Sequence, residues 1–212
     1  KKQLEENSTN IEGTTNTENS TKENNTENKD EYIQNNQISN ESEENNMYST
    51  GKHHAEIVVK NYGTIALELD ADVAPITVEN FANLVNEGFY NGLTFHRIIS
   101  GFMIQGGDPL GNGTGGSSKT IKGEFASNGV KNSISHVRGT ISMARSSMPN
   151  SASSQFFIVH QDSTFLDGKY AAFGTVTSGM EVVDKICADT AVEDDNGTVA
   201  KNNQPVIEKI TI

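Results

Sequence analysis

The sequence predicts a mainly β domain, an antiparallel sheet or closed barrel with two helices, behind a long polar N-terminal segment. Short apolar runs recur along the chain, glycine-rich loops separate them, and only two stretches carry a helical period. Many strands with few helices favour an antiparallel sheet or barrel over a doubly wound fold, which needs helices on both faces of a parallel sheet.

The first 50 residues differ in composition from the rest of the chain. They contain 4 Lys/Arg against 11 Asp/Glu, 12 Asn and only seven apolar residues. Because so little apolar surface cannot offset the entropy of ordering a chain, we predict a disordered segment over residues 1–54. Gly51 to His54, "GKHH", form its linker end. The folded domain is then residues 55–212.

The folded domain is predicted to begin with a hairpin and a helix. "EIVVKNYGTIALELD" contains two alternating runs around a turn at residues 61–63. "APITVENFANLVNEGFY" then changes to a helical period, with Val78, Phe81 and Val85 on one face. Pro75 suits the first turn of this helix, and Gly88 suits its end.

Further strands are predicted at "LTFHRIIS", "GTISMAR", "SQFFIVH", "YAAFGTV" and "PVIEKITI". If Phe95–Ile99 is a strand, Phe95, Arg97 and Ile99 share one face and His96 lies on the other. Residues 102–105 are expected to follow in a short bend. The second helix is predicted to begin at Ser178, which forms an S-x-x-E capping box with Glu181.

Residues 111–116, "GNGTGG", match the G-x-G-x-x-G spacing of a dinucleotide-binding loop. Such a loop follows a buried strand and leads into a helix whose N-terminus holds the pyrophosphate. Here Pro109 precedes the glycines, and "SSKTIKGEF" follows them without a helical period. The P-loop pattern also does not match, because Ser117 and Ser118 stand where Gly-Lys is required. We therefore predict no nucleotide cofactor.

Charge and composition exclude several other classes of partner. The formal net charge is −12 without a clustered basic stripe, so we expect no nucleic-acid partner. The single cysteine, Cys187, offers neither an internal disulfide nor a metal site of zinc type. No apolar run of about 18 residues is present, so we expect no intrinsic transmembrane segment. Without a coiled-coil pattern, a monomer is expected.

The stretch Phe95–Asp108, "FHRIISGFMIQGGD", places an arginine among aromatic and β-branched residues, where it is costly unless paired or functional. Together with "GNGTGG", "ISMARS", "SSQFFIVH" and "FLDGKYAAFG", in this order and spacing, it resembles the cyclophilins. These are the cyclosporin-binding peptidyl-prolyl cis/trans isomerases, and the resemblance is closest to short bacterial members. It covers about Glu56 to Ile212 and implies an eight-stranded antiparallel β-barrel with one helix closing each end.

The resemblance also implies a site. Arg97 matches the catalytic arginine, Gln105 orients the substrate, and Phe102 completes the catalytic set. The matching substrate-binding positions are Met103, Asn112, Gly113, Ala144, Arg145, Gln155, Phe157, Phe165, Leu166 and Tyr170. Of these, Met103, Phe157 and Leu166 form the proline pocket together with Phe102. Ala144 and the backbone of Arg145 form a peptide-binding edge.

Two positions depart from the family pattern. Phe165 replaces a pocket tryptophan, and Tyr170 replaces a pocket histidine. Because phenylalanine lacks the indole N–H donor, we expect cyclosporin to bind only weakly. Both replacements are compatible with isomerisation, which breaks no bond and therefore needs no cofactor and no metal.

The implied function is isomerisation of X–Pro bonds in proline-containing polypeptide clients during protein folding, a chaperone-like role. The alternative is a non-catalytic proline-peptide binding module of the same shape. A hydrolase using His96, His136 or His160 is a further alternative, although no G-x-S-x-G elbow occurs. The acidic Asn-rich lead resembles the spacer of bacterial surface lipoproteins. It predicts an extracytoplasmic protein, lipid-anchored or secreted, with a cytoplasmic location as the alternative.

Overall fold

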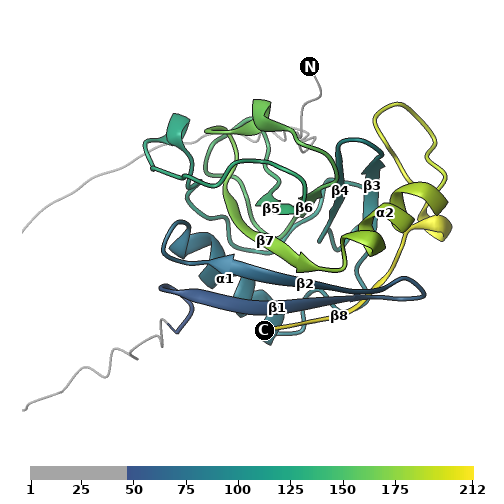
Figure 1. The fold of residues 1–212 in the computed structure, drawn as a ribbon, viewed down its shortest axis with the longest axis horizontal. Coiled ribbons are helices and arrows are strands. Elements are labelled where there is room, and N and C mark those ends of the chain that lie inside the picture. Colours follow the sequence, from purple (N-terminus) through teal and green to yellow (C-terminus); the bar gives the residue numbers. More distant parts are fainter. Residues whose placement is uncertain (1–46) are drawn as a thin grey trace, which may run out of the picture. The chain divides into compact units, whose positions relative to one another are not determined.

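The structure is a computed structural model in which residues 47–212 are described (Figure 1). The strands are β1 (Lys52–Val59), β2 (Gly63–Asp70), β3 (Phe95–Ile99), β4 (Met103–Gly106), β5 (Thr140–Met143), β6 (Phe156–Val159), β7 (Ala172–Ser178) and β8 (Ile207–Thr211). The helices are α1 (Pro75–Asn86) and α2 (Met180–Asp189), and three 3₁₀ turns are η1 (Ala126–Asn128), η2 (Thr164–Leu166) and η3 (Lys201–Asn203). The strands form one antiparallel sheet in the order β3-β4-β6-β5-β7-β2-β1-β8. β4 is the one strand that the sequence pattern did not predict.

The two edge strands of the sheet, β3 and β8, meet and nearly close it into a barrel. Thr94 and Val206, the residues just before these strands, form an antiparallel bridge. The backbone N–H of Phe95 donates to the carbonyl oxygen of Pro205 at 2.9 Å. The prediction of an eight-stranded antiparallel barrel is therefore confirmed for the described part of the chain.

Both helices lie against the sheet through an apolar face, α1 and α2 on different sides of the domain in Figure 1. Helix α1 begins at Pro75, as predicted, and Gly88 with φ 70° follows its end. Phe81 of α1 and Val183 of α2 are fully buried in the main core. The predicted helical periods thus identify the faces that pack.

Helix α2 begins two residues later than predicted. Ser178 is the last residue of β7 and pairs with Ala66 of β2, so it belongs to the sheet and not to a cap. The residue before Met180 is Gly179, with φ 92° and no side-chain capping bond. A Cβ at Gly179 would lie 2.3 Å from the carbonyl oxygen of Thr64, so this turn requires glycine. The predicted capping box is wrong.

The domain also begins earlier than predicted. Lys52 is the first residue of β1, where it pairs with Asp70 and forms an ion pair with it. Tyr48 packs against the main core, and its ring meets that of His53 edge-on with centroids 5.1 Å apart. The prediction of a disordered linker is therefore wrong for residues 47–54. The rest of that predicted segment, residues 1–46, lies outside the described residues.

The buried apolar side chains form two clusters. The larger is the main core, and the second apolar cluster comprises Ile99, Phe102, Met103, Ala144, Phe157, Val159, Leu166 and Tyr170. Strand alternation separates the two, since successive side chains point to opposite faces of a sheet. On β6, Phe156 and Ile158 belong to the main core, whereas Phe157 and Val159 belong to the second apolar cluster.

A β-bulge in β3 changes which side chains share a face. Phe95 pairs with Gly106 and Arg97 pairs with Gln105, so the register shifts between them by one residue. Phe95 consequently joins the main core, whereas Ile99 joins the second apolar cluster. The prediction that Phe95 shares a face with Arg97 is wrong, because alternation alone cannot anticipate the extra residue.

Candidate active site

Four neighbouring strands place one residue each in a row across the sheet. Arg97 on β3 pairs with Gln105 on β4, Gln105 pairs with Phe157 on β6, and Phe157 pairs with Ser142 on β5. Directly paired residues point to the same face of a sheet. A cation, an amide and an aromatic ring therefore stand side by side. The second apolar cluster lies on this face too, since Met103, two residues before Gln105, belongs to it.

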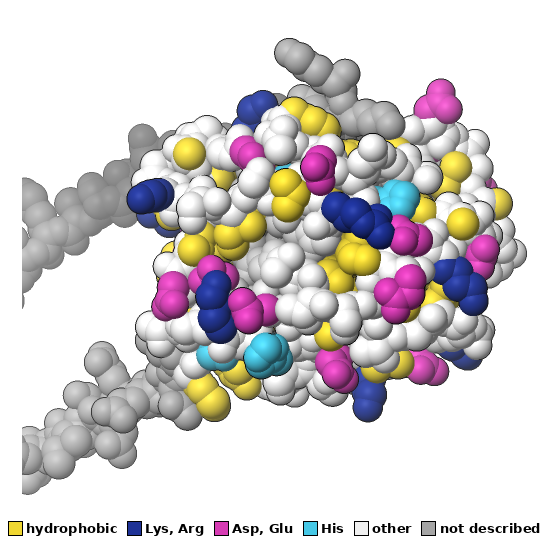
Figure 2. Space-filling model, in the orientation of Figure 1, with side chains coloured by type: hydrophobic (Ala, Val, Ile, Leu, Met, Phe, Trp, Pro, Cys, Tyr) yellow, Lys and Arg dark blue, Asp and Glu magenta, His cyan; other side chains and the backbone are white. Residues whose placement is uncertain are grey.

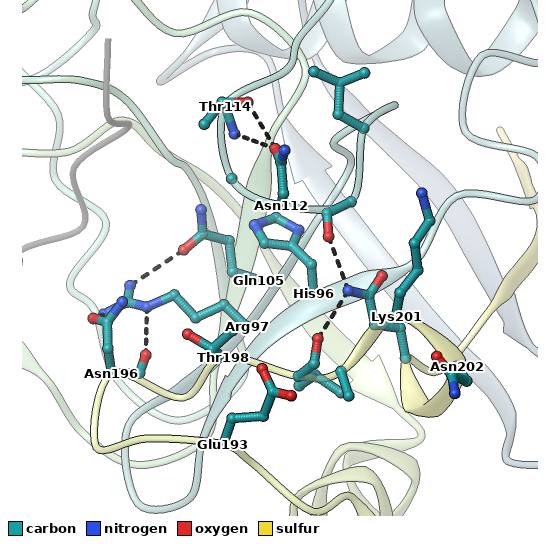
Figure 3. Close-up of a pocket in the computed structure, with 16 residues that line it drawn as sticks. His96, Arg97, Gln105, Asn112, Thr114, Glu193, Asn196, Thr198, Lys201 and Asn202 are labelled. Carbon is teal, nitrogen blue, oxygen red and sulfur yellow. Dashed lines mark hydrogen bonds between the residues drawn. The ribbon is translucent and has the colours of Figure 1, made fainter. Parts of the chain in front are cut away.

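Gln105 and Asn196 hold the guanidinium of Arg97, a residue that is only 8% exposed. Its Nη1 donates to Oε1 of Gln105 at 3.3 Å. Its Nε donates to the carbonyl oxygen of Asn196 at 2.8 Å, and Nη2 donates to Oδ1 of the same residue at 2.9 Å (Figure 3). Burial lowers the pKa of Arg97, while Tyr170 and Asp194 act in the opposite direction. An arginine so placed remains protonated at physiological pH.

A chain of amide hydrogen bonds continues from Gln105 across the sheet. Nε2 of Gln105 donates to Oε1 of Gln155 at 2.9 Å, and Nε2 of Gln155 donates to the carbonyl oxygen of Gly115 at 2.7 Å. Both glutamines are buried. Because every step of the chain is satisfied, the amide of Gln105 has a fixed orientation beside Arg97.

Aromatic contacts organise the second apolar cluster. The ring of Phe157 meets that of Tyr170 edge-on, with centroids 6.0 Å apart. Phe165 is 52% exposed, and its ring stacks on Phe102 at 5.6 Å. The guanidinium of Arg145 lies 4.8 Å above the centre of the Tyr170 ring, a cation–π distance. The cluster thus has one exposed aromatic ring at its edge.

The structure brings the predicted site residues into one region. The apolar set Phe102, Met103, Ala144, Phe157, Leu166 and Tyr170 belongs to the second apolar cluster. Phe165 and Arg145 pack on members of that cluster. Gln155 bonds to Gln105, and Asn112 and Gly113 line a hollow together with Arg97 and Gln105.

The loop at residues 111–116 wraps around a buried carboxylate. The oxygens of Asp108 accept the backbone N–H groups of Leu110, Asn112 and Gly113 at 2.8, 3.0 and 2.6 Å. Burial would raise the pKa of Asp108, but these donors outweigh it and hold the pKa below its usual value. A Cβ at Gly115 would lie 2.1 Å from Oδ1 of Asp108, so the wrapping requires glycine there. The glycines thus let the backbone fold around the Asp108 carboxylate, and the loop does not have the role of a phosphate-binding loop.

A hollow of about 590 Å³ lies between this loop and residues 193–204 (Figure 3). His96 lines it beside Arg97, although alternation predicted that the two would lie on opposite faces. Both ring nitrogens of His96 are buried and make no hydrogen bond to any described residue. Burial lowers the pKa of His96 to about 4, so the ring is neutral at physiological pH.

One histidine has the connectivity that a hydrolase would need, but it is sealed inside the protein. Nδ1 of His136 lies 2.9 Å from Oδ1 of Asp167, and Nε2 lies 2.9 Å from Oγ of Ser142. His136 is 1% exposed and Ser142 is fully buried, so these bonds belong to the framework of the domain. Nδ1 of His160 accepts the backbone N–H of Gly101, so that imidazole is also held in the framework.

A family model described as cyclophilin type peptidyl-prolyl cis-trans isomerase/CLD matches residues 54–212. The chain belongs to the cyclophilin family. Its activity is therefore peptidyl-prolyl cis-trans isomerisation. The resemblance identified from the sequence is confirmed.

Named relatives agree with this assignment. The peptidyl-prolyl cis-trans isomerase of Helicobacter pylori is 51% identical over 128 residues, which cover 59% of this chain and 76% of the relative. Peptidyl-prolyl cis-trans isomerase B of Bacillus subtilis is 50% identical over 117 residues, covering 55% and 78%. A Cryptosporidium parvum cyclophilin, crystallised in the presence of the dipeptide Ala-Pro, has 32% identity and a TM-score of 0.67. The match covers 76% of this chain and 98% of that one.

Four further features of this cyclophilin concern metal binding, membrane spanning, surface charge and thiol chemistry. Within residues 47–212, no group of three or more His, Cys, Asp or Glu is placed to hold a metal ion. No helix of the described range is both long and apolar enough to cross a bilayer. On the face shown in Figure 2, charged side chains of both signs are interspersed. Burial raises the pKa of Cys187 to about 12, which makes its thiol a poor nucleophile.

Sequence reasoning missed one residue of the site, Asn196. It takes two hydrogen bonds from Arg97 although 99 positions separate the two in the chain. Nothing in the local pattern around Asn196 indicates this contact, because it arises only when the loop after α2 folds back onto β3. An isolated bridge between Arg97 and Thr198 marks where the loop joins the strand.

Proposed function

We propose that this cyclophilin holds the proline ring of a client against the second apolar cluster while Arg97 donates a hydrogen bond to the proline nitrogen. The planar X–Pro amide resists rotation with a barrier of ~18–20 kcal/mol. When the bond twists, resonance is lost and a lone pair returns to the nitrogen. A donor aimed at that nitrogen stabilises the twisted state over the planar one, which is what catalysis requires.

The row Arg97–Gln105–Phe157 supports this proposal. It sets a permanently charged, multiply donating side chain next to the second apolar cluster. The apolar surroundings also disfavour the charge-separated planar amide. Gln105 is proposed to orient the substrate, with Ala144 and the backbone of Arg145 as the peptide edge.

The experiment is a protease-coupled assay with a proline peptide on wild type and two arginine variants. Arg97→Ala is expected to lower kcat/KM about 10²–10³-fold, the usual effect of removing one aimed donor. Arg138→Ala is the matched control, since Arg138 is an exposed arginine whose guanidinium pairs with Asp184. Its rate should equal that of wild type. If Arg97→Ala were as fast as an active wild type, the donor role of Arg97 would be wrong. If wild type itself did not accelerate the exchange, a proline-binding module would replace the isomerase.

The proposed substrates are proline-containing polypeptides. Support comes from the relative crystallised in the presence of Ala-Pro and from the apolar cluster beside Arg97. We further propose that the chain acts as a monomer, and that cyclosporin binds weakly because Phe165 offers no N–H donor. Calorimetric titration and ultracentrifugation test these points, and submicromolar cyclosporin affinity or a stable dimer would contradict them.

We also propose an extracytoplasmic location, in which the acidic lead tethers the isomerase to a lipid anchor at the cell surface and its clients are secreted proteins. Support comes from the composition of the first 50 residues, with 12 Asn and 11 acidic residues. Fractionation of cells that express the full-length precursor tests this. Recovery with the membrane is expected, and recovery in the cytosol alone would contradict it.

A further inference from the structure

We propose that Asn196 is a positioning residue that aims the guanidinium of Arg97, an inference that rests on the catalytic role proposed for Arg97. Asn196 contacts that guanidinium twice: its carbonyl oxygen accepts from Nε at 2.8 Å, and its Oδ1 accepts from Nη2 at 2.9 Å. Figure 3 shows both groups of Asn196 on one side of Arg97 and Gln105 on the other.

These two bonds fix the plane of the guanidinium. Nε and Nη2 lie on the same edge of the planar group, so two acceptors on one residue hold that edge as a fork. The remaining nitrogen, Nη1, then points in a determined direction, toward Gln105. Without these two bonds, rotation about the last bonds of the side chain would let Nη1 adopt many orientations. Fixing one of these orientations when the substrate twists would then cost conformational entropy.

The backbone of residues 194–199 makes the fork rigid. The N–H of Ile98 donates to the carbonyl oxygen of Gly197 at 2.8 Å, and the N–H of Val199 donates to that of His96 at 3.1 Å. Gly197 has φ 82°, and a Cβ there would lie 2.3 Å from the carbonyl oxygen of Ile98. Gly197 and Val199 therefore attach the loop to β3 on both sides of Arg97, which keeps the neighbouring Asn196 beside the arginine.

The carboxylate of Asp194 binds Thr198 and so joins the two ends of the turn that contains Asn196. Its Oδ1 accepts the backbone N–H of Thr198 at 3.0 Å, and its Oδ2 accepts the hydroxyl of Thr198 at 2.8 Å. These bonds hold the pKa of Asp194 below its usual value. Asn196 contacts the guanidinium through neutral oxygens only, so the fork orients the cation without neutralising its charge. A neutral acceptor leaves the donor strength of Arg97 available for the substrate.

The test compares Asn196→Ala with Asn203→Ala in the coupled assay, with kcat and KM separated by NMR exchange measurements. Asn203 is an exposed asparagine of the same loop, and it is not among the residues that line the hollow beside Arg97. Asn196→Ala removes the side-chain contact to Nη2 of Arg97 and keeps the backbone contact to Nε. We therefore expect kcat to fall about 3- to 10-fold with KM nearly unchanged, less than for Arg97→Ala. Asn203→Ala should match wild type, and both variants should unfold at the same urea concentration.

Arg97→Ala combined with Asn196→Ala distinguishes this inference from the proposed function. If Asn196 acts through Arg97, the double variant is no slower than Arg97→Ala alone. If the double variant were slower than Arg97→Ala by the whole factor that Asn196→Ala causes alone, the positioning role would be overturned. A wild-type kcat for Asn196→Ala would overturn it too. If Arg97→Ala itself retained full activity, the catalytic role of Arg97 would fail first, independently of Asn196.

Discussion

Two adjacent phenylalanines on β6 offer a test of which face of the sheet carries the activity. Phe156 belongs to the main core and Phe157 to the second apolar cluster, and both are fully buried. The perturbation is the same for both: replacement by leucine, which is smaller and remains apolar. We expect both variants to lose stability and only Phe157→Leu to lose additional activity.

The magnitudes follow from burial. Each change opens a small cavity and should cost about 1–2 kcal/mol of unfolding free energy, less than the ~3–5 kcal/mol typical of Phe→Ala. At position 157 the leucine also withdraws about two carbons from contact with the proline ring, at ~0.8 kcal/mol each. That loss of ~1.6 kcal/mol corresponds to about a 15-fold lower kcat/KM. Position 156 lies on the opposite face, so Phe156→Leu should stay within about twofold of wild type.

Urea unfolding gives the stability of each variant, and the protease-coupled assay with a proline peptide gives kcat/KM at a temperature where both are folded. Equal losses of activity at positions 156 and 157 would show that packing in general, and not contact with the proline ring, limits the rate. That result would refute the placement of the proline against the second apolar cluster.

Three further predictions concern pH, the glycine loop and ligand binding. Because the pKa of His96 is about 4 when folded and 6.5 when exposed, the unfolded chain takes up the proton first. The unfolding free energy should therefore fall by up to ~3 kcal/mol as pH drops from about 6.5 to 4. Urea titrations should show a smaller fall for His96→Leu, and an unchanged pH profile would contradict this. Asp108→Asn replaces a carboxylate that accepts three backbone N–H groups, and should cost ~1–3 kcal/mol of unfolding free energy. A neutral result in urea would contradict this. Phe165→Trp restores an N–H donor in a chain without tryptophan, and fluorescence titration should show cyclosporin binding about 2- to 10-fold tighter. Unchanged affinity would show that the missing donor does not limit binding.

Features set by local chemistry could be predicted from the sequence. The alternating runs located seven of the eight strands. Proline and glycine marked the ends of α1, since Pro75 suits a first turn and Gly88 takes a positive φ. The residues that follow "GNGTGG" also suffice to exclude a nucleotide loop, because they have no helical period. In the structure, the N–H groups of Asn112 and Gly113 donate to Asp108.

Features set by tertiary pairing could not be predicted in the same way. Ser178 reads as a helix cap, but pairing with β2 keeps it in the sheet. The bulge in β3 depends on the register with β4, which a single strand does not reveal. The sequence places Lys52 in a linker, whereas pairing with Asp70 makes it part of β1. Asn196 is the clearest case, because only the return of the loop after α2 brings it to Arg97.

We propose that Arg97 acts on the twisted proline bond and not on the bound planar peptide. The most direct measurement is NMR of a proline peptide at equilibrium with wild type and with Arg97→Ala, recording exchange rate and peptide affinity in the same sample. We expect exchange to slow at least 100-fold in the variant while the peptide Kd changes by no more than about threefold. A variant that keeps its exchange rate, or that loses exchange only in proportion to binding, would contradict it.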